Sequence, residues 1–207
     1  IDRFAFGEKE VTKVLKIQRL CIPHGLEPLN RLPFGFPADI FYCHSNASAD
    51  YLKRMYQDSC YLYSSQVIKK LMSFNKKPKK IDKIVFFTQP YSDELTKYTI
   101  EYIEFLIEYV KKSEYFVEVF IKLHPSENKE KYTEILKEIK VIDDISEAVS
   151  SMVCISFFST CLVEALYNNS YSISIEENRI CVPVCEVNIN PEIRKVKSVY
   201  ELREVLD

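Results

Sequence analysis

The organisation of this chain is decided by the stretch Phe120-Ile121-Lys122-Leu123-His124-Pro125-Ser126-Glu127. A run that is typical of a strand, residues 117–122, ends just before His124 and Pro125. A proline disfavours the α region for the residue before it, so we expect His124 to stay extended where the strand stops. In open α/β sheets, ligands bind outside the carboxyl ends of the strands. The stretch therefore predicts an imidazole at a ligand-binding edge of a sheet.

A second junction of the same kind follows the apolar run at residues 152–155 and carries Ser159 and Thr160. One interpretation makes these two residues ordinary helix caps. The alternative uses the same geometry, because the free N–H groups and partial positive charge of a helix N-terminus suit an anion. Glu164 lies one turn further on. It is either a solvated charge or an acceptor for the hydroxyls of a ribose.

Strand and helix patterns alternate along the second half of the chain. Strands are predicted at residues 84–87, 117–122, 152–155 and 170–175, and helices at 93–112, 128–140, 159–167 and 198–206. This alternation predicts an α/β fold, a Rossmann-like parallel sheet with helices on both faces.

The first part of the chain carries a shorter version of the same pattern. Helices are predicted at residues 8–16, 45–56 and 64–72, strands at 19–22 and 39–43, and a loop at 26–37. Residues 73–80 hold four lysines and a proline and are the clearest linker. We interpret them as a solvated hinge in preference to a contact with an acidic membrane surface. The predicted domains are a partial N-terminal Rossmann-like segment, 1–72, this linker, and a second Rossmann-like domain, 81–207.

Composition narrows the possible functions. The formal charge of −2 gives no support to a nucleic-acid partner, and only three glycines occur, which excludes a glycine-rich phosphate loop. No apolar run reaches transmembrane length, and seven cysteines occur without a Cys-x-x-Cys pair, which favours a reduced, cytoplasmic location. Cys181 and Cys185 with a histidine could form a metal site, but their spacing fits structural cysteines better.

Further candidate residues precede these strand ends or follow other strands. His24, before Gly25, either forms a tight turn or presents a catalytic imidazole from the first segment. Thr88, Gln89 and Pro90 close the strand at 84–87, as a capped turn or as nucleotide contacts. Lys122 lies two residues before His124, and an imidazole with a nearby ammonium could bind a phosphate or a leaving-group oxygen.

In chain order, these residues resemble the nucleotide-binding half of a GT-B glycosyltransferase. The resemblance rests on His24-Gly25, Phe86-Phe87-Thr88-Gln89-Pro90, Lys122-Leu123-His124-Pro125 and Phe158-Ser159-Thr160-Cys161-Leu162-Val163-Glu164-Ala165. It covers most of residues 23–175. The most similar members are bacterial sialyltransferases and related capsule or lipooligosaccharide transferases that carry a His-Pro motif and a Ser-Ser or Ser-Thr motif.

The resemblance implies an enzyme that transfers a sugar from a CMP-activated donor to a surface glycan by an inverting mechanism without a bound metal. It implies that His124 and Pro125 contact the nucleotide phosphate or the leaving group, and that Ser159 and Thr160 bind phosphate. No cofactor is implied, because the CMP-sugar is the donor substrate. A carboxylate or histidine of the N-terminal domain acts as general base in such families, for which His24 is the candidate. The partners expected are a nucleotide sugar and a glycan acceptor, with contact at the inner membrane and a homodimer as further possibilities.

The chain departs from the family at one motif. The acidic base motif that ends in glycine in bacterial sialyltransferases is absent, and His24-Gly25 instead resembles the His-Gly of polymer glycerophosphate transferases. Two alternatives therefore stay open: a transferase or epimerase that uses CDP-glycerol or a UDP-sugar, and a nucleotide-binding module without activity. A GT-B enzyme has two Rossmann-like domains, and residues 1–72 resemble only the last part of the first. The chain is thus expected to be inactive alone if the acceptor domain lies elsewhere.

Overall fold

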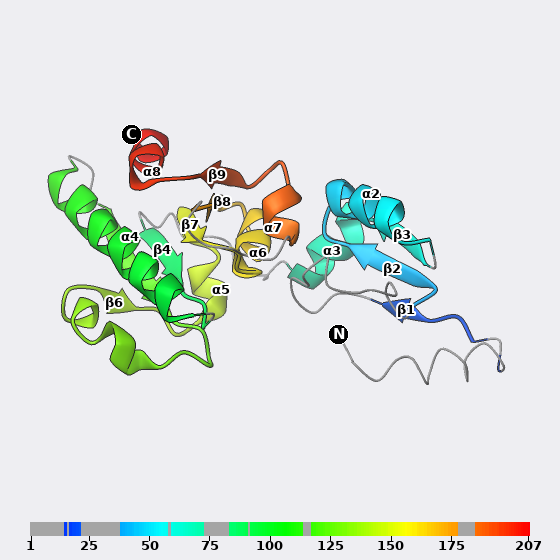
Figure 1. The fold of residues 1–207 in the computed structure, drawn as a ribbon, viewed down its shortest axis with the longest axis horizontal. Helices are drawn as coiled ribbons and strands as arrows, with labels where there is room; N and C mark the ends of the chain where they lie inside the picture. The colour runs from blue at the N-terminus through cyan, green and yellow to red at the C-terminus, as the bar shows by residue number, and fades with distance from the viewer. Residues whose placement is uncertain are drawn as a thin grey trace. The chain divides into compact units, whose positions relative to one another are not determined.

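The protein is described here from a computed structural model, which defines residues 15, 17–21, 38–57, 59–72, 83–90, 92–113, 117–177 and 185–207. The chain divides into two compact units (Figure 1). The first consists of Ile1–Leu71 with Pro183–Pro191, and the second of Met72–Val182 with Glu192–Asp207. The predicted division placed all of residues 81–207 in one domain, whereas residues 183–191 belong with the first unit. The predicted helix at 8–16, apart from residue 15, and the predicted loop at 26–37 and linker at 73–80 lie outside the described residues.

The second unit contains a six-stranded sheet in which every neighbouring pair is parallel. Its strands are β4 (Lys83–Phe87), β5 (Glu118–Lys122), β6 (Lys140–Val141), β7 (Val153–Ser156), β8 (Tyr171–Ile175) and β9 (Arg194–Val196). Their order across the sheet is β6-β5-β4-β7-β8-β9. Numbered from β4, this is the order 3-2-1-4-5-6 of doubly wound nucleotide-binding sheets. The four strands predicted from the apolar runs are confirmed to within one residue.

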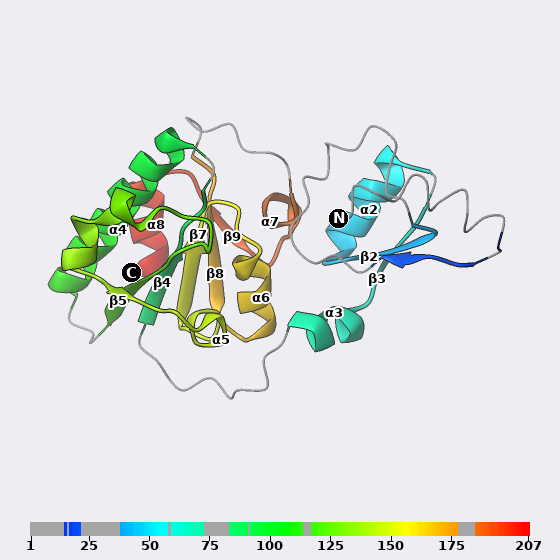
Figure 2. The ribbon, with the colours of Figure 1, turned by 90° about the horizontal axis from the view of Figure 1, so that it is seen from below.

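Helices cover both faces of this sheet (Figure 2). They are α4 (Asp93–Lys112), α5 (Ile145–Ala148), α6 (Cys161–Tyr167) and α8 (Val199–Leu206). Figure 2 shows α4 and α8 side by side on one face, with α5 and α6 toward the other. Ser92 caps α4, since its Oγ accepts a hydrogen bond of 3.0 Å from the N–H of Leu95. The predicted bounds of α4 are confirmed.

The core of the second unit forms where α4 and α8 bury their apolar stripes against the sheet. The central strand β4 is buried from Ile84 to Phe87, as expected for a parallel strand covered on both faces. The ring of Phe157 lies edge-on to Tyr102 of α4, with centroids 5.9 Å apart, and to Phe86 of β4 at 6.1 Å. This packing fixes the backbone just beyond the carboxyl end of β7, where candidate site residues follow.

The prediction of one helix over residues 128–140 is wrong. The segment forms two short 3-10 helices, η1 (Lys129–Tyr132) and η2 (Ile135–Lys137). Thr133 lies between them, and its hydroxyl donates to the carbonyl of Glu130 at 2.8 Å, as does its N–H at 3.3 Å. A threonine that bonds back to the preceding turn competes with the regular α-helical ladder. The apolar side chains that suggested an α-helix are still buried on the inside, at Tyr132, Ile135 and Ile139.

The first unit contains a three-stranded parallel sheet in the order β1-β2-β3. Its strands are β1 (Leu20–Cys21), β2 (Ile40–Cys43) and β3 (Cys60–Tyr63), and its helices are α2 (Asn46–Met55), α3 (Ser65–Met72) and α7 (Glu186–Ile189). Its small core holds Phe41, Cys43, Ala49, Leu52 and Tyr61, and Ile189 of α7 packs against it. The sequence did not predict β3, α7 or β9. All three have at most four residues, too few for a periodic pattern to show.

In the part of the chain that the structure describes, no helix combines the length and the apolar character needed to cross a bilayer.

Candidate functional site

In the sheet of the second unit, the order in which successive strands are added changes side between β4 and β7. From β4 the chain builds outward through β5 to β6, and it then returns to the other side of β4 with β7 and continues to β8 and β9. In doubly wound sheets, ligands bind outside the carboxyl ends of the strands at such a reversal. The residues there are Thr88, Gln89 and Pro90 after β4, and Phe158 to Thr160 after β7. The predicted candidates from these two strand ends thus fall at one place.

Gln89 joins the ends of β4 and β7. Its side-chain oxygen accepts a hydrogen bond of 3.0 Å from the N–H of Phe158 and one of 3.4 Å from the hydroxyl of Ser156. A side-chain amide has one acceptor oxygen and one NH2 group with two donors. Because the oxygen is engaged with β7, the NH2 group is the part of Gln89 that can address a ligand. Gln89 is partly exposed and Pro90 is exposed, so both are accessible.

Thr88 joins the ends of β4 and β5 in the same manner. It is only 2% exposed, its N–H donates to the carbonyl of Lys122 at 3.1 Å, and its Oγ1 accepts from the N–H of His124 at 3.0 Å. Thr88 therefore holds the backbone of His124 and leaves no exposed surface of its own for a nucleotide. Its predicted place at the strand end is right, and its contacts are those of a supporting residue.

The side chain of His124 is exposed at the end of β5, and Pro125 beside it is exposed too. The Nδ1 of His124 accepts a hydrogen bond of 3.1 Å from the N–H of Ser126. In the neutral imidazole, this contact leaves the proton on Nε2. The carbonyl of His124 also accepts from the N–H of Glu127 at 2.9 Å, which closes a tight turn. The local chain thus fixes the ring and presents Nε2–H as a donor.

Lys122 contributes a positive charge beside this turn. It is half-buried at the last position of β5, and its ammonium lies 3.4 Å from the carbonyl oxygen of Leu123. The positive charge of Lys122 is one of the influences that lower the pKa of Cys161, the first residue of α6. Burial is the largest influence there and acts in the opposite direction, so the pKa of the Cys161 thiol is raised to about 11. The thiol stays protonated at neutral pH and is not a nucleophile.

Ser159 bonds to the first residue of α6, although the N-cap position belongs to Thr160, which makes no side-chain capping hydrogen bond. The Oγ of Ser159 accepts from the N–H of Cys161 at 3.2 Å, and its carbonyl accepts from the N–H of Leu162 at 3.1 Å. The carbonyl of Thr160 accepts from the N–H groups of Val163 and Glu164, at 2.9 and 3.2 Å. The N–H groups that were expected to bind an anion are therefore already bonded inside the chain. The N-terminus of α6 is therefore not the expected anion site. Thr160, the N-cap residue, and Glu164, within the helix, remain half-buried candidates.

The sequence reasoning missed two carboxylates at the end of β8. Glu176 and Glu177 follow that strand directly, and β8 is the neighbour of β7. The N–H of Glu176 donates to the carbonyl of Val196 at 2.7 Å, and the hydroxyl of Tyr102 donates to Glu177 Oε2 at 3.4 Å. The predicted strand at 170–175 ends just before them, so the rule that singled out His124 would have found them.

The remaining predicted residues lie away from this edge. His24 is outside the described residues, as is Cys181, one half of the possible metal pair. Cys185 is buried, and its thiol lies 3.2 Å from the side-chain oxygen of Asn188, within the cap of α7. His44, at the end of β2 in the first unit, is buried, and this burial lowers its pKa to about 4. No cluster of three or more His, Cys, Asp or Glu side chains suited to a metal occurs among the residues that the structure describes.

The chain was compared with known proteins. No protein-family model matches it, and no curated protein matches it.

Proposed function

We propose that the second unit binds the nucleotide part of an activated sugar, and that the chain is the donor-side part of a sialyltransferase-like glycosyltransferase. The donor is a CMP-sugar and the acceptor a surface glycan such as a capsule or lipooligosaccharide. One observation carries the proposal: the reversal of strand order between β4 and β7 occurs where the Gln89 and Ser159 segments lie. The sugar and the transferase class come from the motif resemblance, which is an argument by analogy.

The hydrogen bonds within the site leave donor groups available, which favours a ligand that presents hydrogen-bond acceptors. Gln89 can offer its NH2 group because its oxygen is engaged, and His124 can offer Nε2–H because its Nδ1 is engaged. The charged ammonium group of Lys122 has three donors and no acceptor. A nucleotide phosphate presents only acceptor oxygens, and hydrogen bonds between such oxygens and donors that include a cation are the strong ones. These three side chains therefore suit a phosphate better than they suit a hydroxyl or an amide.

By the motif resemblance, we expect the transfer to be a single displacement. The acceptor oxygen forms a bond to the anomeric carbon of the donor sugar while the bond from that carbon to the phosphate oxygen of CMP breaks. The electron pair goes to the phosphate, where His124 and Lys122 stabilise the developing charge. The proton of the acceptor hydroxyl goes to a general base, for which His24 is the candidate. A single displacement inverts the configuration at the anomeric carbon.

A thermal-shift series with CMP, CDP, UDP and GDP tests the proposal. A ligand that binds only the folded state stabilises it by about 2.7 kcal/mol at a hundredfold excess over its dissociation constant. The motif resemblance favours CMP, so we expect CMP to raise the melting temperature more than the other three nucleotides do. Lys140→Ala is the control variant. Its lysine is exposed and pairs with Glu118 at the opposite end of the sheet, so we expect the same shift with CMP as in the unchanged chain. A shift with UDP equal to that with CMP would replace the CMP-sugar by a UDP-sugar. No shift with any of the four nucleotides would refute nucleotide binding.

A further inference from the structure

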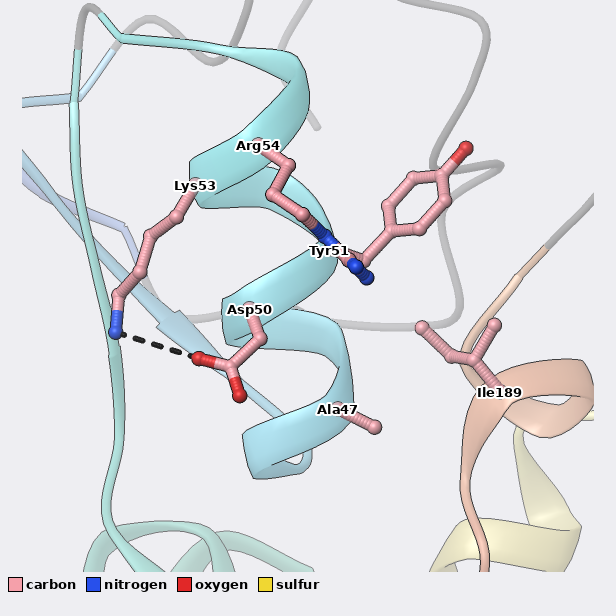
Figure 3. A pocket seen from close by; sticks show the side chains of 6 residues that line it. All are labelled: Ala47, Asp50, Tyr51, Lys53, Arg54 and Ile189. Carbon is pink, nitrogen blue, oxygen red and sulfur yellow. Dashed lines mark ion pairs between the residues drawn. The ribbon is translucent and has the colours of Figure 1, made fainter.

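The first unit has a pocket of its own, with a volume of about 660 Å³ (Figure 3). Its described lining residues are Ala47, Asp50, Tyr51, Lys53, Arg54 and Ile189. Four of them, Ala47, Asp50, Tyr51 and Arg54, follow the spacing i, i+3, i+4, i+7 and so share one side of α2. Ile189 comes from α7, which belongs to the same unit. Asp50, Lys53 and Arg54 are exposed, so the pocket is open to solvent.

The charges of this pocket are unequally satisfied. The ammonium of Lys53 lies 3.7 Å from Asp50 Oδ1, and both side chains are more than half exposed, so the pair is weak. Arg54 makes no ion pair within the described part of the chain. Its planar guanidinium offers a fork of donors that matches a carboxylate or a phosphate. Among the described lining residues there is one more cation than anions, and the cation that makes no ion pair among them is the one best suited to an acid group.

The other described lining residues are apolar or aromatic: Ala47, Tyr51 and Ile189. Figure 3 shows Tyr51 and Arg54 on the side of α2 that faces Ile189, while Lys53 turns the other way toward Asp50. Tyr51 is half-buried and packs against the small core of the unit, so its ring is held in place. A flat ring beside a guanidinium and a carboxylate suits a ligand with an apolar face, an acid group and hydroxyls. A sugar that carries one acid group has all three.

We propose that this pocket binds an acid-bearing sugar, with the sugar ring against Tyr51, the acid group on Arg54 and a hydroxyl on Asp50. A carboxylate and a phosphate are the two sources of such an acid group. The identification of this sugar as part of the acceptor glycan rests on the proposed function. The binding itself does not, because all six residues belong to the first unit and the nucleotide candidates of the second unit are not among them.

The probes are D-glucuronate and glucose 6-phosphate, titrated into the whole chain by calorimetry, with glucose and inorganic phosphate as comparisons. We expect both sugar acids to bind more tightly than glucose and than phosphate. Arg54→Ala should weaken binding by about ten- to hundredfold, as expected for a lost hydrogen bond to a charged group. Lys69→Ala is the matched control, an exposed cation of α3 that does not line the pocket, and it should bind as the unchanged chain does.

Three results would overturn this inference: equal affinity for Arg54→Ala, equal affinity for glucose, or phosphate binding as tightly as the sugar acids. The failure of the proposed function looks different. If glucuronate binds through Arg54 while CMP gives no thermal shift, this inference holds and the nucleotide proposal fails. If CMP stabilises both the unchanged chain and Arg54→Ala while no sugar acid binds, the nucleotide proposal holds and this inference fails.

Discussion

Two histidines occupy the same place in sequence, directly after a strand or one residue beyond it, and the structure treats them in opposite ways. His44 follows β2 in the first unit and is 5% exposed, whereas His124 follows β5 in the second unit and is exposed. Burial lowers the pKa of His44 to about 4, so its imidazole is neutral at pH 7. The Nδ1 of His124 accepts a hydrogen bond from the N–H of Ser126, and the residue is exposed. A histidine at a strand end is therefore a candidate ligand only when the next residues turn the chain outward.

The residue that follows makes the difference. Pro125 comes after His124 and a turn closes at Glu127, whereas Ser45 comes after His44 and caps α2 at once. The Oγ of Ser45 accepts from the N–H of Ser48 at 3.1 Å, which starts the helix directly after the buried His44. One strand end thus leads into a loop and the other into a helix. The tests that follow make the comparison sharper or break it.

The largest effect is expected on the stability of the chain, through His44. Its folded pKa of about 4 lies below its ordinary value of 6.5, so between these pH values the unfolded chain binds a proton that the folded chain does not. The contribution of neutral His44 to stability is fully present above pH 6.5 and is lost as the pH falls toward 4, by on the order of 3 kcal/mol. His44→Asn should remove this part of the pH dependence. Urea unfolding at pH 7 and pH 4.5 measures it, and an identical loss of stability in both proteins would contradict the burial argument.

The next effect is expected on ligand affinity, through His124. His124→Ala should weaken the dissociation constant for CMP by ten- to hundredfold, since a lost hydrogen bond to a charged group costs about 1.5–3 kcal/mol. The melting temperature without ligand should hardly move, because the side chain is exposed. His44→Ala should do the opposite, with lower stability and unchanged affinity in the protein that still folds. If both changes weaken CMP binding equally in calorimetry, His124 is not the phosphate contact.

A smaller effect is expected from Ser159. Ser159→Ala removes the acceptor for the N–H of Cys161 and should cost about 1 kcal/mol of stability, the usual cost of a lost cap. Its effect on CMP affinity should be less than that of His124→Ala, because the hydroxyl is already engaged with the backbone. Chemical denaturation and calorimetry on the same sample separate the two effects. Unchanged stability together with a larger loss of affinity than His124→Ala shows would make Ser159 a direct ligand instead.

No effect at all is expected from a chelator. The chain has no Asp-x-Asp motif, and Asp143-Asp144 is its only adjacent pair of aspartates. One of that pair, Asp144, caps α5 through its Oδ1, which accepts from the N–H of Ser146 at 2.8 Å. CMP titrations with and without EDTA should therefore agree. A loss of binding with EDTA that magnesium or manganese restores would show that a metal takes part.

The strands of the second unit could be predicted because they are continuous apolar runs. The segment Ile84 to Phe87 is buried at every position, and such a run needs no knowledge of its neighbours to be recognised. The edge strand β9 lacks this signal, because it is only three residues long and carries polar side chains. The helix pattern at 128–140 gave the right buried residues and the wrong helix type, since periodicity does not register the back-bonding of Thr133.

The sequence could predict which candidate residues follow a strand, but not which strand ends are neighbours in the sheet. Local patterns indicated that Gln89 and His124 each follow a strand, and the structure places them after β4 and β5, which pair. They did not indicate that β7 is the other neighbour of β4, and the contact between Gln89 and Phe158 depends on that order. For the same reason, the N-terminus of α6 was predicted as an anion site without knowledge that its own carbonyls and Ser159 engage it.

One feature of the fold bears on how the chain matures during synthesis. The helix α7 is encoded after β8, yet Ile189 packs against the core of the first unit, whose strands end at Tyr63. The core of the first unit therefore stays incomplete until α7 has been synthesised, more than a hundred residues after β3. At a translation rate of about 5–20 residues per second, the wait between the two segments is on the order of ten seconds. The second unit has all its strands except β9 by then, so most of its sheet can form before the core of the first unit is complete.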